Sequence, residues 1–260
     1  MRLHRVKAIL IHTQYHLRHS VETWTDIFWF PVINTVVISG LALYIGKSQG
    51  MVSGEILIAG LVMWFAFEPA SYSIAVSALW EVWSRSFSSL FITPLTISEF
   101  IAGQMLFSLV KEFLLITVVS TISYLILGFS IFSLGPIVVL YLFLLTMFGW
   151  AFGCFILGLV LRFGTRIQSL AWGLAYAVQP FIGMYYPVEI FPPVFRIIST
   201  LLPPTYVYKA MRENIAGNPP GDLLYIAFVL NIVYFIAGFL FMKMMWERAR
   251  RSGSLARMEE

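Results

Sequence analysis

Three ionisable residues, Glu68, Lys111 and Glu112, lie within stretches of the sequence that are otherwise apolar. A charged group at membrane depth is costly, so such groups normally face a cavity or a partner of opposite charge. The pattern allows two kinds of chemistry. Lys111 and Glu68 form a structural ion pair, or the acids pass protons along a relay. The ion pair is the simpler interpretation.

Motifs of catalytic chemistry are missing. Residues 40–48 read GLALYIGKS and imitate a phosphate-binding loop, but five residues separate the two glycines where that loop requires four. No His-Glu-x-x-His or Gly-x-Ser-x-Gly motif occurs either. We therefore expect no catalytic, cofactor-binding or metal-binding residues in this chain and predict that it is not an enzyme by itself.

The composition is that of a membrane protein. Of the 260 residues, 59% are hydrophobic and only 12% are charged, whereas soluble domains carry about 25% charged residues. The net charge of +4 does not indicate nucleic-acid binding, because the basic residues form no continuous stripe. Apolar runs of about 20 residues predict an all-α, polytopic fold with six transmembrane helices at residues 27–46, 56–79, 100–127, 132–161, 169–187 and 223–243.

The distribution of charge predicts the orientation. With six spans both termini lie on one side, and that side carries most of the 17 Lys and Arg residues. By the positive-inside rule we expect both termini in the cytoplasm and the protein in the cell (inner) membrane. Three regions follow: an N-terminal amphipathic interfacial helix over residues 1–26, a membrane domain over 27–246 and a basic cytoplasmic tail over 247–260.

The connection between the second and third predicted spans contains a short amphipathic helix at about residues 80–94. Trp83, Phe87 and Leu90 recur at helical spacing, polar residues fill the other side, and Pro94 ends the helix. Such a helix either anchors the turn in the interface or docks into a groove of a cytoplasmic partner. The residues that would make the docking contact are Glu81, Trp83, Arg85, Phe87, Leu90 and Pro94.

Five prolines interrupt the apolar character of residues 185–206, which read YYPVEIFPPVFRIISTLLPPTY. Proline ends one helix and fits the first turn of the next, so the pattern predicts two short helices at residues 193–202 and 205–216. Glu189 and Arg196 are expected to pair across the first of these helices or with a second subunit, or to form a surface ion pair of little consequence.

Two further patterns concern packing and a path for a substrate. Gly149-x-x-x-Gly153 allows a neighbouring helix to approach closely, and we expect that helix to belong to the same subunit. Aromatic residues such as Trp172 and Tyr176 either line a substrate path or form packing and interfacial belts. Belts are the simpler interpretation.

The order of these features resembles the type-2 ATP-binding-cassette (ABC) exporter permeases, in which the helix between spans two and three is called the coupling helix. The matching residues are Glu81, Leu90 and TPLT (93–96) in the predicted coupling helix, and Pro187, Pro192 and LPPTYVYKAMR (202–212) farther along the chain. The chain departs from the family where a frequent Gly-Thr pair is replaced by Arg85-Ser86.

The resemblance implies a function and partners. The chain would be the transmembrane permease subunit of an ATP-driven exporter, paired with a second copy of itself or a related permease. A separate cytoplasmic ATP-binding-cassette ATPase subunit would dock on the coupling helix and bind ATP and Mg, so this chain would hold no cofactor. The cargo would be a drug or an amphipathic lipid-like molecule, or alternatively a lipid-linked polysaccharide. A self-contained secondary transporter is the competing interpretation.

The resemblance also implies that residues 188–216 form short re-entrant helices on the external side, between spans five and six, which act as an external gate. The residues assigned to this gate are Tyr185, Tyr186, Pro187, Glu189, Pro192, Arg196, Pro203, Pro204, Tyr206 and Arg212. Irregular backbone at membrane depth is tolerated where protein or a water-filled cavity shields it.

Overall fold

A computed structural model describes residues 21–83 and 96–251 of the chain. Every regular element in those two ranges is helical. The elements are α2 (Val21–Gln49), α3 (Met51–Ala75), α4 (Ser77–Trp83), α6 (Ile97–Leu127), η1 (Ile131–Leu134), α7 (Ile137–Phe163), η2 (Gly164–Ile167), α8 (Gln168–Val178), η3 (Gln179–Phe181), η4 (Val188–Ile190), α9 (Pro193–Leu201), α10 (Pro203–Ile215) and α11 (Leu223–Arg251), where η denotes a 3₁₀ helix. Most of the predicted interfacial helix and the predicted docking residues Arg85, Phe87, Leu90 and Pro94 lie outside the described residues.

Five stretches of helix are long and apolar enough to cross a membrane. They are Trp29–Ser48, Met51–Ala75, Ile97–Leu127, Ile137–Phe181 and Leu223–Arg251. These stretches coincide with the predicted first, second, third and sixth spans, and Ile137–Phe181 covers most of the predicted fourth span and most of the predicted fifth. The chain is therefore a multi-pass, all-helical membrane protein over its described part.

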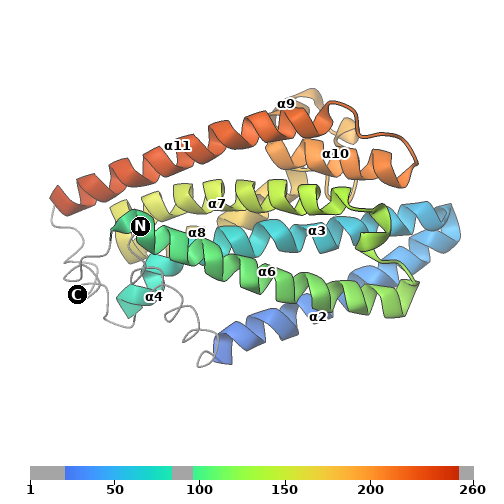
Figure 1. The fold of residues 1–260 in the computed structure, drawn as a ribbon, viewed down its shortest axis with the longest axis horizontal. Helices are drawn as coiled ribbons and strands as arrows, with labels where there is room; N and C mark the ends of the chain where they lie inside the picture. The colour runs from blue at the N-terminus through green and yellow to red at the C-terminus, as the bar shows by residue number, and fades with distance from the viewer. Residues whose placement is uncertain (1–20, 84–95, 252–260) are drawn as a thin grey trace.

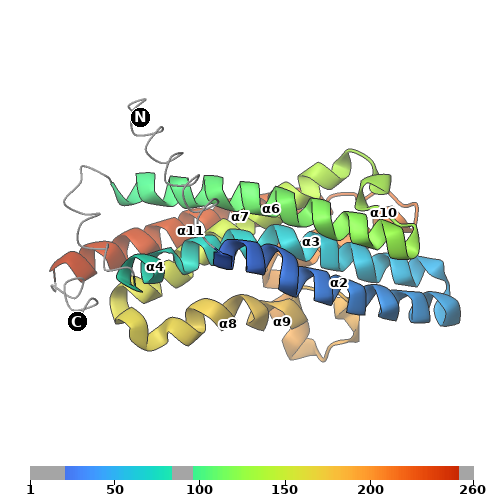
Figure 2. The same ribbon diagram turned by 90° about the horizontal axis from the view of Figure 1, so that it is seen from below.

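The predicted fifth span, residues 169–187, does not form one full-length helix. It corresponds to α8 and η3, and α8 has 11 residues, about 16 Å of helix against a hydrocarbon core of about 30 Å. Pro180 lies in η3, where its missing N–H ends the α-helical hydrogen bonding. Figure 2 shows α8 running back along the bundle from the end at which α7 finishes. The chain thus reverses direction there, but with a helix shorter than predicted.

The long helices pack side by side around α3 (Figure 1). α3 contacts α2, α6, α7, α8 and α10, and most of its residues are buried. α4 and the C-terminal ends of α7 and α11 lie at one end of the bundle, here called the α4 end. The α2–α3 turn, η1 and α10 lie at the opposite end, here called the α10 end.

Small residues allow α7 to pack closely against its neighbours. A β-carbon placed on Gly149 would lie 2.6 Å from the carbonyl oxygen of Phe67, and one placed on Gly153 would lie 2.6 Å from that of Ser71. Both contacts are with α3 of the same chain, which confirms the predicted packing within the subunit. On the other side of α7, Gly238 lets α11 approach the α7 backbone in the same way.

Local sequence signals set both ends of α6. Thr96 and Glu99 form a capping box: the Glu99 N–H donates to Thr96 Oγ1 at 3.3 Å, and the Thr96 N–H donates to Glu99 Oε2 at 3.0 Å. The helix ends at Gly128, whose φ of 72° is in the left-handed region that glycine adopts readily. These caps fix the span that carries Lys111 and Glu112.

Candidate functional site

α4 is the described part of the predicted coupling helix. α3 ends at Ala75, and the chain continues after Val76 as the separate helix α4. Glu81 is buried, with 7% of its surface exposed, whereas Trp83 is 43% exposed. The sequence pattern placed Glu81 on the polar side of an amphipathic helix, so its burial differs from the expected exposure. The physical reason is that α4 packs against both α3 and α7, which covers the side that carries this acid.

The aromatic side chains of α4 pack toward α8. The ring of Trp83 stacks on that of Trp172, with the centroids 6.2 Å apart and the planes at 29°. Trp80 meets Trp83 edge to face at 5.1 Å, and Tyr72 of α3 meets Trp172 edge to face at 5.4 Å. Trp83 therefore joins α4 to α8 and does not project freely from the surface.

An open surface cavity of about 540 Å³, closer to a groove than to an enclosed pocket, lies beside this aromatic contact. Its lining residues are Trp83 of α4 and Gln168, Ser169, Trp172 and Gly173 of α8. The sequence pattern predicts Trp83 for docking and Trp172 for a substrate path or a packing belt. Nothing in the sequence places α4 beside α8, so the contact between these two residues was not expected.

The intramembrane charges take different partners. Lys111 is buried, and its ammonium lies 5.3 Å from the centroid of the Tyr72 ring in a cation–π contact. Glu112 is 7% exposed, and the Thr146 hydroxyl of α7 lies 2.9 Å from each of its carboxyl oxygens. Glu68 is partly buried in α3, and its pairing with Lys111 stays a prediction. Sequence reasoning missed Thr146, because one threonine in an apolar helix gives no signal.

Prolines divide the chain at the α10 end much as predicted. α9 begins at Pro193, directly after Pro192, and α10 begins with Pro203 and Pro204. The bounds of both short helices differ from the predicted ones by one or two residues. Within α9, Ser199 alone is buried, so this helix covers little of the rest of the protein.

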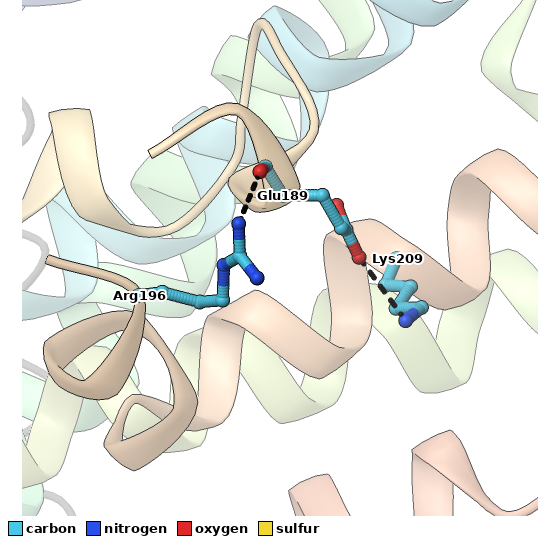
Figure 3. A network of polar contacts seen from close by, with 3 residues as sticks. All are labelled: Glu189, Arg196 and Lys209. Carbon is cyan, nitrogen blue, oxygen red and sulfur yellow. Dashed lines mark hydrogen bonds and ion pairs between the residues drawn. The ribbon is translucent and has the colours of Figure 1, made fainter. Parts of the chain in front are cut away.

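The side chains of Glu189 and Arg196 do not pair across α9, which corrects that expectation (Figure 3). The Arg196 guanidinium donates to the main-chain carbonyls of Glu189 at 2.6 Å and Phe191 at 3.2 Å. The Glu189 carboxylate instead pairs with Lys209 of α10 at 3.2 Å. Glu189 precedes α9, in η4, so helical spacing does not relate it to Arg196.

The charge environment favours the ionised form of Glu189. Burial alone would raise its pKa, but its hydrogen bonds, including that from Lys209, and the positive charges of Lys209 and Arg212 outweigh burial and lower the pKa. The loop and α10 are therefore joined by a charge-assisted contact near the surface of the α10 end.

Arg212 attaches α10 to the turn after η3. Its guanidinium donates to the main-chain carbonyl of Gly183, and Gly183 has a φ of 70°, which favours glycine at this position. Burial raises the pKa of the neighbouring Tyr208 and of Tyr185. Both phenols therefore stay neutral at physiological pH, and the buried Tyr208 hydroxyl has no hydrogen-bond partner among the described residues.

Other predicted gate residues brace the connecting loops. The Tyr186 hydroxyl donates to the carbonyl of Pro180 at 3.0 Å, and the Tyr206 hydroxyl donates to that of Thr200 at 2.8 Å. Pro187 lies directly before η4. The prolines and tyrosines at the α10 end thus hold a set of short helices and turns in one arrangement.

Two residues that the sequence analysis missed join α10 to α7. The Tyr141 hydroxyl donates to the carbonyl of Ala210 at 3.4 Å. Asn214 donates to the Tyr141 hydroxyl at 3.3 Å and to the carbonyl of Leu134 at 3.4 Å. Among residues 21–83 and 96–251, no group of three or more His, Cys, Asp or Glu residues is placed to hold a metal ion.

Comparison with known proteins gives one match to a protein family. The family model described as "ABC-2 type transporter" matches residues 10–216. The comparison with curated proteins gave no match. The matched range includes α4, the intramembrane charges, α8 and both short helices of the α10 end.

Proposed function

The chain belongs to the ABC-2 type transporter family, the family of type-2 ABC permease subunits, and we propose that it forms the translocation pathway of an ATP-driven exporter. The family match over residues 10–216 is the observation that carries this proposal. ATP hydrolysis belongs to a separate cytoplasmic ATPase subunit, which binds the nucleotide and Mg. This chain supplies the membrane path and the surface on which the ATPase docks.

The α4 end faces the cytoplasm in this proposal. Exposed basic residues of α7, η2 and α11 gather there: Arg162, Arg166, Lys243, Arg248, Arg250 and Arg251. The positive-inside rule then places both termini in the cytoplasm and the protein in the inner membrane. α8, η3 and the turn after them carry the chain back toward the α10 end and serve as the fifth of six crossings.

The coupling segment, residues 80–94, receives the ATPase. Closure of the ATPase subunits around ATP pushes this segment, and the stacked rings of Trp83 and Trp172 pass the displacement to α8. The predicted docking residues therefore fall into two groups. Trp83 faces inward to α8, whereas Phe87 remains the candidate for contact with the ATPase.

The α10 end forms the external gate. α9 exposes Val194, Ile197 and Leu201, an apolar face suited to the outer leaflet of the membrane. Arg196, Lys209 and Arg212 hold the loops around η4 and the turn after η3 in the closed arrangement. Release of these contacts opens the path to the outside or laterally into the leaflet.

Two copies of the chain, or one copy and a related permease, enclose the path. α8 supports this arrangement because only Ala171 and Ala175 of its residues are buried within the single chain. The proposed cargo is a drug or an amphipathic lipid-like molecule. A lipid-linked polysaccharide is the alternative cargo, and a secondary transporter is the alternative class.

Co-purification tests the proposal. The tagged chain is isolated from its native membrane in several mild detergents, and ATPase activity is assayed on the material that accompanies it. The test variant is Phe87→Asp in the docking segment, and the control is Phe132→Asp, an exposed position at the α10 end that a cytoplasmic subunit cannot reach.

We expect a stoichiometric ATPase with the wild type and with Phe132→Asp, and its loss from Phe87→Asp while that variant remains in the membrane. If no ATPase accompanies the wild type in any detergent, the exporter proposal is withdrawn. Glu68 and Glu112 would then be tested for ion coupling, as a secondary transporter requires.

A further inference from the structure

The cavity between α4 and α8 has the properties of a small-molecule site. Its volume of about 540 Å³ falls within the range of about 300–1,000 Å³ that is usual for ligand pockets. Trp83 and Trp172, which line it, are 43% and 42% exposed. Two indole rings therefore present much of their surface beside a hollow.

The rings are held in place from the protein side. Trp172 is fixed by the edge of Tyr72, and Trp83 by the edge of Trp80. A ligand that stacks on such rings does not need to order them first, which reduces the entropic cost of binding. The site is preorganised for a flat partner.

Room for the ligand is present beside Gly173. A β-carbon placed on Gly173 would have no atom within 4 Å, so that side of α8 is open. Gly173 is helical and does not have a positive φ. A larger side chain would therefore enter the cavity without straining the backbone or displacing a neighbour.

The polar groups that line the cavity disfavour a charged ligand. They are the amide of Gln168 and the hydroxyl of Ser169, and among residues 21–83 and 96–251 no charged side chain lines the cavity. A cation or an anion would lose hydration here without gaining a counter-charge. One amide and one hydroxyl suit a ligand with one or two hydrogen-bonding groups.

The same groups argue against a sugar and against an acyl chain. A sugar ring carries hydroxyls on most of its carbons, more than Gln168 and Ser169 can satisfy, and unpaired polar groups cost binding free energy. An acyl chain would cover Gln168 and Ser169 without bonding to either. A flat aromatic ring uses both the indole faces and the two polar groups.

We propose that the cavity lined by Trp83, Gln168, Ser169, Trp172 and Gly173 binds flat, uncharged aromatic amphiphiles. That these molecules are the cargo rests on the proposed export function. Binding itself does not, because it needs no ATPase. The ligand touches Trp83, a residue of the coupling segment, so its presence would be sensed at the contact between this chain and its ATPase.

The test uses the full chain alone in lipid nanodiscs, with 9-anthracenemethanol as the probe. Energy transfer from tryptophan to anthracene is titrated, and the signal from probe dissolved in empty nanodiscs is subtracted. The test variant is Gly173→Leu, which fills the cavity. The control is Gly40→Leu, since a β-carbon on this helical glycine of α2 also has no atom within 4 Å.

We expect saturable binding to the wild type and to Gly40→Leu, and a loss of affinity of about tenfold or more for Gly173→Leu. A second variant, Trp172→Leu, removes a flat face, keeps an apolar side chain, and should weaken binding as well. If Gly173→Leu is not monodisperse, the result for Trp172→Leu decides whether the proposed binding site is correct. 2-Anthracenesulfonate, the charged counterpart, should bind at least about tenfold more weakly than the alcohol.

Competition separates the kinds of ligand. Decahydro-2-naphthol, a saturated alcohol, and methyl glucoside should leave the bound probe in place. Displacement by either compound at the probe's own concentration, or unchanged binding to folded Gly173→Leu and Trp172→Leu, overturns the proposal. The result is independent of the ATPase: the binding site can fail while co-purification succeeds, and the reverse.

Discussion

Glu112 of α6 and Thr146 of α7 form a buried contact between two helices. The number of protons that the two side chains share predicts how the protein responds when either one is replaced. Thr146 Oγ1 lies 2.9 Å from both carboxyl oxygens of Glu112 and 2.8 Å from the carbonyl of Leu142. A hydroxyl has one proton and cannot donate to all of these acceptors. If Glu112 is protonated, it donates to Thr146, and Thr146 donates to Leu142. Both protons then have an acceptor, whereas an ionised Glu112 would leave Thr146 one proton for three acceptor oxygens.

This arrangement predicts unequal effects of the two single changes. Thr146→Val removes the partner that the structure gives the Glu112 carboxyl, whereas Glu112→Leu leaves Thr146 bonded to Leu142. A buried polar group without its partner costs about 1–3 kcal/mol in water-soluble proteins, and hydrogen bonds between membrane helices contribute up to about 1.7 kcal/mol. We therefore expect Thr146→Val to lower the free energy of unfolding by about 1–2 kcal/mol.

Two further variants test whether Glu112 and Thr146 stabilise the protein through one shared hydrogen bond. Glu112→Gln keeps an N–H donor toward Thr146 without any charge, so it should remain within about 0.5 kcal/mol of the wild type. Adding Thr146→Val to Glu112→Leu should cost less than about 0.5 kcal/mol, because no buried carboxyl is then left unpaired. Reversible unfolding in bicelles with increasing dodecyl sulfate measures each free energy.

Two results would contradict a protonated Glu112 that bonds to Thr146. If Glu112→Gln lowers the free energy of unfolding by well over about 0.5 kcal/mol, Glu112 is ionised in the folded protein and the proton count is wrong. If Thr146→Val costs as much in the Glu112→Leu background as in the wild type, the cost arises from lost packing around Thr146 and the hydrogen bond contributes nothing measurable.

Three more predictions concern the helix contacts and the α10 end. Gly153→Leu should cost at least about 1–3 kcal/mol in detergent unfolding, because its β-carbon would overlap the α3 backbone; a stable variant would contradict that close approach. Arg212→Gln should speed hydrogen exchange of the turn around Gly183, and unchanged exchange would mean that the guanidinium does not hold it. Because the folded pKa of Glu189 is lowered, its pairing with Lys209 should persist at neutral pH and be lost as the pH falls below about 4.5 through that pKa, and Lys209→Met should raise this pKa in an NMR titration; an unchanged value would exclude the ion pair.

Long apolar helices were predictable because each carries its own signal. The runs that became α3, α6 and α11 each contain a long, predominantly apolar window, and a helix satisfies its own backbone hydrogen bonds inside a membrane. The start of α6 was less visible, although Thr96 and Glu99 carry the spacing of a capping box. The length of α8 was overestimated because hydropathy continues past Pro180, while hydrogen bonding does not.

Contacts between elements were mostly not predictable. Glu189 and Arg196 are seven residues apart, a spacing that suggested one helix face. The Glu189 carboxylate instead pairs with Lys209, which lies on α10. Glu112 and Thr146 are 34 residues apart and meet only because α6 and α7 pack together. The sequence shows which residues need partners, and the packing of the helices decides which partners they receive.

α8 moves at a lower cost than α3, and this follows from burial. α3 buries most of its residues among its neighbouring helices, and displacing it would break the close contacts at Gly149 and Gly153. α8 buries only two alanines, so its displacement exposes little apolar surface. Its aromatic contacts, with Trp83 on one side and Tyr72 on the other, connect it to the docking segment and to the ring that receives Lys111. In the proposed mechanism a push on α4 shifts α8 against α3 before it disturbs the bundle, and the cavity beside Trp83 and Trp172 lies where that shift begins.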